Sequence, residues 1–223
     1  MNIRSPIIVA GLLAWWGGLT ASRADVIGVN LLTNSDLTAS NMNGWTVTAN
    51  GGDGWAVNAG VFYTSHEWDI RSQTVDLLAK GLTTAELEAS PDIRVGVYKN
   101  TYWGGLYFLD VSLQDAGHTV ITNFQLGSQS DPIVEGSSFN WNYDWVGTTF
   151  SDYASGVRYV VYTDGGQDNR GWAGHYGTSF ELAEVTVVPE PHILGLFLLA
   201  VALAWYYRKW SRLARSAQPA RWQ

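Results

Sequence analysis

Short runs of β-forming residues, broken by glycine-rich turns, fill most of the chain between residues 25 and 188. The turns are marked by clusters at 50–54, 104–105 and 164–166, each with at least two glycines. Such clusters end an element every few residues, which suits strands better than helices. The pattern predicts seven strands: Gly60–Ser65, Ile93–Tyr98, Leu106–Gln114, Thr119–Leu126, Trp145–Phe150, Val157–Thr163 and Thr178–Val187.

One short helix is expected between the first two of these strands. Thr83 or Thr84 suits its N-cap, Glu86 and Leu87 suit its body, and Pro91 lies beyond its end. Seven or more short strands separated by turns are typical of an all-β antiparallel sandwich. The chain has no cysteine, but a domain of about 165 residues is large enough to bury a core without disulfides.

Charge is distributed very unevenly along the chain. The stretch from 25 to 190 holds all 20 acidic residues and only six basic ones, which gives it a formal charge of −14. Binding to nucleic acid requires Lys and Arg against the phosphates, so no nucleic-acid partner is expected. The acidic balance suits a soluble extracellular module. Its seven Trp serve either as packing bulk or as platforms for a ligand.

The C-terminal region combines a polar motif, an apolar run and a basic cluster. Val188-Pro189-Glu190-Pro191 is followed by an apolar run at 192–207, a basic tail at 208–215 and the end of the chain at 216–223. Cations beside a membrane span stay cytoplasmic, and aromatic residues gather at the interface. We therefore expect a transmembrane helix at 192–207, with 216–223 in the cytoplasm. A buried core helix is the alternative, although such a helix is rarely apolar on every face.

The N-terminus has the pattern of a secretory signal. Arg4 precedes an apolar stretch at 7–19, and Ser22-Arg23-Ala24 has small residues at the two positions that a signal peptidase reads. A signal peptide at 1–24 with cleavage after Ala24 is expected, and an uncleaved anchor is the alternative. The exported domain is then 25–187, and the C-terminal signal is 188–215.

This C-terminal arrangement resembles the PEP-CTERM sorting signal of exported bacterial proteins. In that family an exosortase, which is a membrane transpeptidase, recognises the Pro-Glu-Pro motif, here Pro189-Glu190-Pro191. The resemblance implies that the secretion machinery and an exosortase are partners of the chain. It also implies a membrane anchor before processing, and a final place at the cell surface or in the extracellular matrix.

Four segments between residues 29 and 187 resemble, in order and spacing, the F-box-associated domain, the sugar-recognition half of eukaryotic glycoprotein-targeting F-box proteins. The segments are Asn30–Asn34 with Gly44–Trp45 and Gly51–Trp55, then Phe62–Trp68 with Gln73–Leu78 and Gly81–Leu82, then Phe150–Tyr153 with Gly156–Val160, and last Asp164–Asp168 with Trp172–Gly177. The resemblance implies a galactose-binding-like jelly-roll sandwich of ten antiparallel strands. A signal peptide rather than an F-box is expected before the domain, so the resemblance is not extended to a ubiquitin-ligase adaptor.

The resemblance also implies candidate ligand-binding residues. Family members that bind glycans hold the chitobiose core of N-linked chains in loops at one end of the sandwich. Their contacts are an aromatic residue just before a Glu-Trp pair, here His66, and a Tyr-Trp-Lys triplet, here Gly171-Trp172-Ala173. An exposed indole can stack on a pyranose while polar neighbours bind its hydroxyls. The predicted site is therefore Trp172 with His66, Gly171, Ala173 and Asp168. The alternatives are a packing wedge for Trp172 and a polar loop role for His66.

A tight turn is expected at Gly165-Gly166, with Asp164 and Asp168 capping backbone amides. The same two carboxylates, with nearby carbonyls, form a second hypothesis, a Ca²⁺ site, because calcium prefers oxygen ligands. No other cofactor is expected.

Motifs for common catalytic chemistry are not found in the sequence. It has no HExxH metal spacing, no GxSxG elbow and no phosphate-binding loop. Acidic pairs such as Asp110 with Asp115, or Glu67 with Asp69, leave an acidic glycoside hydrolase as a remote alternative, because that reaction requires two carboxylates. The sequence therefore predicts a noncatalytic module that binds carbohydrate or glycoprotein. The alternative from another class is a structural or adhesion protein of the extracellular matrix without a specific glycan site.

Overall fold

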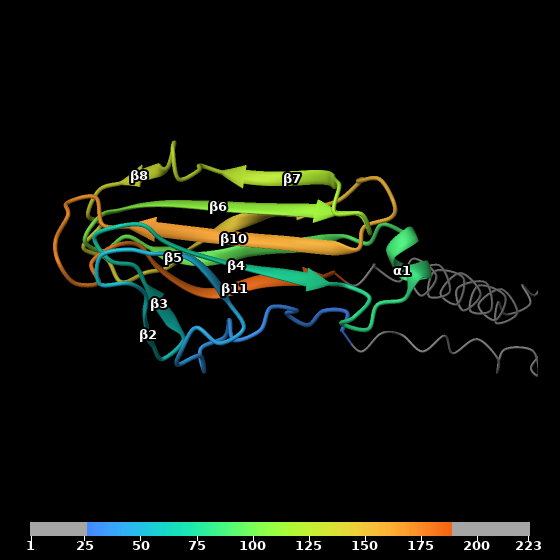
Figure 1. The fold of residues 1–223 in the computed structure, drawn as a ribbon, viewed down its shortest axis with the longest axis horizontal. Helices are drawn as coiled ribbons and strands as arrows, with labels where there is room; N and C mark the ends of the chain where they lie inside the picture. The colour runs from blue at the N-terminus through green and yellow to red at the C-terminus, as the bar shows by residue number, and fades with distance from the viewer. Residues whose placement is uncertain (1–25, 189–223) are drawn as a thin grey trace, which may run out of the picture. The chain divides into compact units, whose positions relative to one another are not determined.

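Two antiparallel sheets pack against each other in the computed structural model, which describes residues 26–188 (Figure 1). The first sheet has the order β1 (Thr46–Asn50), β4 (Asp69–Asp76), β10 (Tyr159–Gln167), β6 (Gly105–Gln114) and β7 (Val120–Leu126), with β8 (Ile133–Glu135) paired to β6. The second has the order β2 (Ala56–Asn58), β3 (Val61–Tyr63), β11 (Ser179–Val187), β5 (Ile93–Asn100) and β9 (Asp144–Phe150). The predicted all-β antiparallel sandwich is confirmed, with eleven strands in this part of the chain.

All seven predicted strands are present, with small shifts at their ends. Four further strands, β1, β2, β4 and β8, were not predicted from the sequence. Two of them, β2 and β8, have only three residues each, which is too short for a clear alternation. The long strand β4 was missed for a different reason, because Asp69, Arg71 and Gln73 occupy its buried positions. Polar residues at these positions hide the alternation of apolar and polar residues that marks a half-buried strand.

The predicted short helix is α1 (Thr84–Glu88), and its cap is Thr83. The Thr83 hydroxyl accepts a hydrogen bond from the Glu86 amide at 3.3 Å, and the Glu86 carboxylate accepts one from the Thr83 amide at 2.7 Å. This reciprocal pair satisfies two amides that a helix start would otherwise leave without partners. Leu87 turns inward and is buried, so the helix closes one end of the sandwich.

The expected turn at Gly165-Gly166 is wrong, because both glycines lie inside β10. Gly165 pairs with Ile70 of β4 on one side and with Phe108 of β6 on the other. A Cβ atom at Gly165 would lie 2.8 Å from Cε1 of Phe108 and 2.9 Å from the carbonyl oxygen of Asp69. Glycine is therefore required here for close packing within the sheet.

An ion pair lies inside the core between the sheets. Arg71 and Asp164 have no exposed side-chain surface, and the Arg71 Nε and Nη2 atoms donate to the two Asp164 oxygens at 2.7 and 2.9 Å. The Tyr162 hydroxyl donates to the same carboxylate at 2.9 Å. The guanidinium carbon lies 4.0 Å from the ring centres of both Trp45 and Phe62. Aromatic faces and a carboxylate together compensate the charge of this buried arginine.

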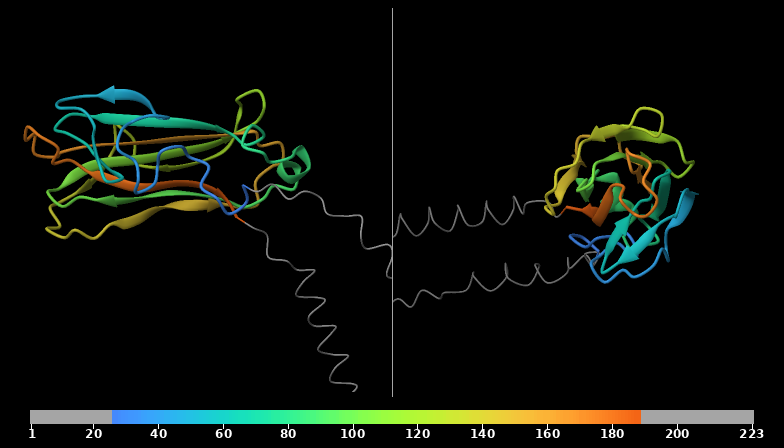
Figure 2. Two further views of the ribbon diagram at one scale, coloured as in Figure 1. Left: turned by 90° about the horizontal axis from the view of Figure 1, so that it is seen from below. Right: turned by 90° about the vertical axis from the view of Figure 1, so that its left-hand side faces the viewer.

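The two ends of the sandwich differ. Helix α1 lies at one end, together with the turn between β6 and β7, and the opposite end is made of loops (Figure 1; Figure 2, left). No helix within residues 26–188 has the length and hydropathy of a membrane span. The predicted signal peptide at 1–24, the sorting signal from Pro189 to residue 215 and the end at 216–223 lie outside the described residues.

Candidate functional site

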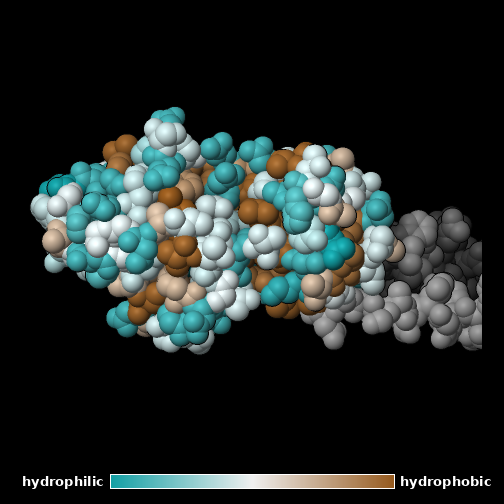
Figure 3. All heavy atoms as spheres, in the orientation of Figure 1, coloured by the Kyte–Doolittle hydropathy of each residue, from teal (hydrophilic) through white to brown (hydrophobic). Residues whose placement is uncertain are grey.

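Five segments form the end of the sandwich opposite α1, which we call the loop end. They are residues 50–55, 64–68, 101–104, 136–143 and 168–178. On the face seen in Figure 3 the most hydrophobic residues lie nearer α1, and the loop end is mostly hydrophilic to neutral. All the ligand residues predicted from sequence belong to this end.

A buried aspartate shapes the loop that carries Trp172. Asp168 is 1% exposed, and its carboxylate accepts hydrogen bonds from the amides of Arg170 at 2.8 Å and Trp172 at 2.7 Å. The Asp168 amide donates to the Ser65 carbonyl at 2.7 Å. The predicted capping role of Asp168 is thus confirmed. Because its carboxylate is enclosed, its contribution to a site is to hold the Trp172 backbone in position.

Trp172 both packs and remains accessible. Its ring lies edge-on to Trp103 at 6.4 Å and to Tyr176 at 6.2 Å between centroids. The Arg170 guanidinium carbon lies 5.2 Å from the Trp172 ring centre. Even so, 45% of the residue stays exposed. The indole therefore has fixed neighbours at its edge and free surface for a ligand, and the flanking Gly171 and Ala173 are exposed as well.

His66 lies on a separate loop that is joined to the Trp172 loop through Asp53. The His66 Nδ1 atom lies 3.4 Å from an Asp53 carboxylate oxygen. The same oxygen accepts a hydrogen bond from the Gly174 amide at 2.6 Å. Asp53 lies in the glycine-rich turn 50–54, and no pattern in the sequence marked it as a site residue. This carboxylate connects the two segments that sequence alone assigned to one site.

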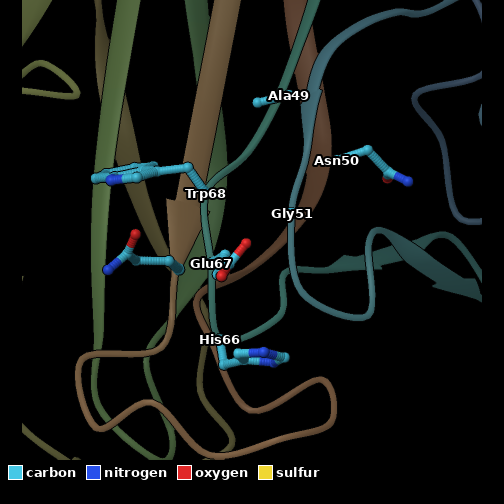
Figure 4. A pocket seen from close by; sticks show the side chains of 7 residues that line it. Ala49, Asn50, Gly51, His66, Glu67 and Trp68 are labelled. Atoms are coloured by element: carbon cyan, nitrogen blue, oxygen red, sulfur yellow. The ribbon is translucent and has the colours of Figure 1, made fainter.

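A surface hollow of about 470 Å³ lies beside His66. It is lined by Ala49, Asn50, Gly51, His66, Glu67, Trp68 and Gln167, and Figure 4 shows His66, Glu67 and Trp68 following one another on one segment. The Glu67 carboxylate accepts a hydrogen bond from the Gly52 amide at 3.1 Å, and Trp68 packs on Phe108 with a centroid distance of 5.7 Å. In this Glu-Trp pair a carboxylate therefore binds a loop amide beside a packed indole, which is a structural role.

The carboxylates suggested for calcium are both engaged by internal partners. Asp164 has no exposed surface and binds Arg71 and Tyr162 instead of capping amides. Asp168 accepts from the two amides of its own loop. Within residues 26–188, no group of three or more His, Cys, Asp or Glu side chains is arranged to hold a metal ion.

The two acidic pairs considered for hydrolysis differ in burial and in hydrogen bonding. Glu67 is exposed, whereas Asp69 has no exposed surface, and burial raises the Asp69 pKa to about 6. Asp110 lies within β6, and burial raises its pKa. Asp115 lies in the following turn and accepts hydrogen bonds from the amides of Gly117 and Thr119. The Glu67–Asp69 pair therefore offers only one open carboxylate.

A cluster of exposed rings at the loop end was not predicted. Tyr102 and Trp141 stack with a centroid distance of 4.0 Å and an interplanar angle of 17°. Phe139 and Trp103 complete the cluster through edge contacts with Tyr102. Phe139 and Trp141 are 65% and 64% exposed. The only signal in the sequence was the high density of aromatic residues in 102–103 and 139–143. These segments have no strand pattern, so their sequence did not show on which surface the rings would lie.

Comparison with known proteins agrees with the F-box-associated resemblance. A family model described as "F-box associated region" matches residues 23–187. F-box only protein 6 of Homo sapiens is 32% identical over 179 residues, covering 72% of this chain and 59% of its own length. F-box only protein 27 of Mus musculus is 33% identical over 181 residues, which cover 72% of this chain and 60% of that protein. The chain thus spans about six-tenths of the length of these relatives.

Among solved structures, the CBM22-1 xylan-binding domain from Paenibacillus barcinonensis Xyn10C matches with a TM-score of 0.40 and 12% identity. The match covers 72% of this chain and 96% of that domain.

Proposed function

The chain belongs to the F-box-associated family, and on that premise we propose that residues 25–187 form a noncatalytic module that binds carbohydrate or the glycan of a glycoprotein. The observation that carries the proposal is the exposed indole of Trp172, held by the buried Asp168 and located at the same end of the sandwich as the His66 hollow. A rigid aromatic face with polar groups nearby is the usual basis of sugar recognition.

The polar groups needed beside the indole come from neighbouring segments. The Arg170 guanidinium lies over the Trp172 ring, and His66 with Asp53 lies next to the same loop through Gly174. These side chains offer donors and acceptors for sugar hydroxyls. Gly171 and Ala173 have no comparable groups, so we propose that they leave space beside the indole rather than bind the ligand themselves.

The proposal is tested by a glycan array probed with residues 25–188, which contain both sheets and the core cluster. Trp172→Ala is the test variant. Val120→Ala is the matched control, because Val120 is 53% exposed and begins β7 at the α1 end. Binding that Trp172→Ala abolishes and Val120→Ala keeps supports the proposed site. Binding that survives Trp172→Ala retains the function but rejects the site. No binding by a folded sample favours a structural or adhesion role, in which the edge contacts of Trp172 only pack the loop.

We further propose that the module is exported and processed by an exosortase. This rests on the signal pattern at 1–24 and on the motif, apolar run and basic tail from Val188 to residue 215. Its place is then the cell surface or extracellular matrix, where a polysaccharide or glycoprotein is the partner. Mass spectrometry of the mature protein tests this, because processing predicts a new N-terminus at Asp25 and a C-terminus near Pro189-Glu190-Pro191. A mature protein that keeps residues 192–223 would contradict it.

A further inference from the structure

We propose that Trp141, stacked on Tyr102, is a second sugar subsite, and that the module therefore binds a neutral oligosaccharide long enough to extend from Trp172 to Trp141. The proposal rests on the proposed function, because it takes Trp172 as the first subsite.

The geometry of the ring series carries this inference. From Trp172, successive centroid distances are 6.4 Å to Trp103, 4.8 Å to Tyr102 and 4.0 Å to Trp141. Trp103 and Tyr102 therefore separate the two exposed indoles, and among the described rings Trp141 and Trp172 make no direct contact. A ligand that touches both must be extended across the loop end.

The free face of Trp141 is suited to stacking. One of its faces is covered by Tyr102 at 4.0 Å, in nearly parallel planes, and 64% of the residue is nevertheless exposed. Large exposed aromatic residues that lie side by side are uncommon on a surface that only contacts water. Ring-on-ring stacking also holds the indole in one orientation, which lowers the entropy lost when a ligand binds.

The loop that carries Trp141 is held by hydrogen bonds to and from its backbone. The Asn100 side-chain amide donates to the carbonyls of Asn140 at 2.8 Å and Asn142 at 2.5 Å. The Phe139 amide donates to the Tyr102 carbonyl at 3.2 Å. The two ring-bearing segments, 101–104 and 136–143, are joined further by the Ser138 amide, which donates to the Thr101 carbonyl at 3.4 Å, and by the Ser137 hydroxyl, which donates to the Trp103 carbonyl at 2.6 Å. The platform is formed before any ligand arrives.

The chemistry of these two segments indicates a neutral ligand. Neither 101–104 nor 136–143 contains a charged residue, although the domain as a whole is strongly acidic. The Arg170 guanidinium that reaches the second segment is engaged there by the Ser137 hydroxyl at 3.1 Å. The second segment instead offers exposed Ser138, Asn140 and Asn142 around the rings. Hydroxyl and amide groups beside aromatic faces match the alternation of polar edges and apolar faces in an uncharged sugar chain.

The experiment is calorimetric titration of the full chain and of residues 25–188 with neutral ladders of N-acetylglucosamine, mannose, glucose and galactose, from disaccharide to hexasaccharide. The expected result is an affinity that rises with chain length by about tenfold in at least one ladder. Trp141→Ala should remove the gain with length, so that longer oligosaccharides bind no more tightly than the disaccharide. Trp141→Phe should keep most of the gain, and Trp172→Ala should weaken every member.

Several outcomes would overturn the inference. Binding without length dependence, or a gain that Trp141→Ala leaves intact, rejects the second subsite while the proposed function stands. Wild-type protein that binds no ladder member and nothing on the glycan array rejects both. A different result would show that the Trp141 platform binds polypeptide. In that case Trp141→Ala would weaken binding to a deglycosylated protein and leave binding to the sugar ladders unaltered. Thermal unfolding of each variant checks that it is folded.

Discussion

Arg71 and Asp164 face each other directly across β4 and β10, and their side chains form a two-bond ion pair with no exposed surface on either partner. The pair lies among core rings, with Trp45 and Phe62 both 4.0 Å from the guanidinium carbon. A buried charge in such surroundings is tolerated only while its partner remains. The ion pair therefore links adjacent strands of one sheet to the aromatic side chains between the sheets.

Removing one member of this pair should be severely destabilising. Arg71→Met is expected to lower the free energy of unfolding by about 3–5 kcal/mol, because the Asp164 carboxylate stays buried without its cation. The double variant Arg71→Met/Asp164→Leu removes both charges and should recover part of the loss. Urea denaturation of the three proteins measures this. A double variant less stable than Arg71→Met would contradict the argument.

Asp69 should make stability depend on pH in mildly acidic solution. Burial raises its folded-state pKa from the ordinary 3.8 to about 6, although the Ser65 amide and His175 favour the charged form. The folded state thus holds the proton more tightly than the unfolded state. This stabilisation is complete below about pH 4 and lost as the pH rises through about 6, amounting to ~3 kcal/mol in the limit.

Asp69→Asn tests this by removing the titrating group, and urea denaturation at several pH values between about 4 and 7 is the measurement. Between these pH values, the free energy of unfolding of Asp69→Asn should change less steeply with pH than that of the unsubstituted protein. Asp76→Asn serves as the comparison, because bonds from Arg158 lower the Asp76 pKa to about 2. The stabilisation that ionised Asp76 provides is lost only as the pH falls from about 4 towards 2. Asp76→Asn should therefore leave the pH dependence of stability between about 4 and 7 unaltered. An unchanged slope in Asp69→Asn would disprove the assignment.

Asp168→Ala tests whether glycan binding requires the correct position of Trp172, because the substitution keeps the indole but removes the carboxylate that holds its backbone. The substitution leaves the amides of Arg170 and Trp172 without their acceptor, at a cost of about 1–3 kcal/mol in the free energy of unfolding. Glycan affinity should fall although the indole remains. Near-ultraviolet circular dichroism and the glycan array measure the two effects together. Unaltered affinity in a loop with a changed spectrum would show that Asp168 does not position the site.

Gly165→Ala should destabilise the sandwich without any change in turn geometry. The added Cβ would meet the Phe108 ring at 2.8 Å and the Asp69 carbonyl at 2.9 Å, so a loss of about 1–3 kcal/mol is expected from overpacking. Gly136→Ala is the matched control, because a Cβ there has no atom within 4 Å and the residue has no positive φ. Thermal unfolding compares the two. Equal melting temperatures would contradict the packing argument.

Sequence analysis predicted the strands that carry apolar alternation and the helix that carries a capping box. It failed at β4, where a buried ion pair replaces the apolar pattern, and at Gly165-Gly166, where glycines serve close packing inside a strand. Within the candidate site it selected Trp172 and His66 through the family resemblance. It did not find Asp53 or the rings around Trp141, because their partners lie far away in the chain.

The sequence by itself determined the fold class, the family and the end of the sandwich that carries the candidate site, because alternation, turn residues and motif spacing are local properties. Only the tertiary structure decided which side chains meet there. Asp164 binds Arg71 from 93 positions away, and Asp53 binds the Gly174 amide from 121 positions away. The same carboxylate chemistry serves a core ion pair in one case and a loop junction in the other. Burial and the pairing of distant strands distinguish the two, and neither can be read from neighbouring residues.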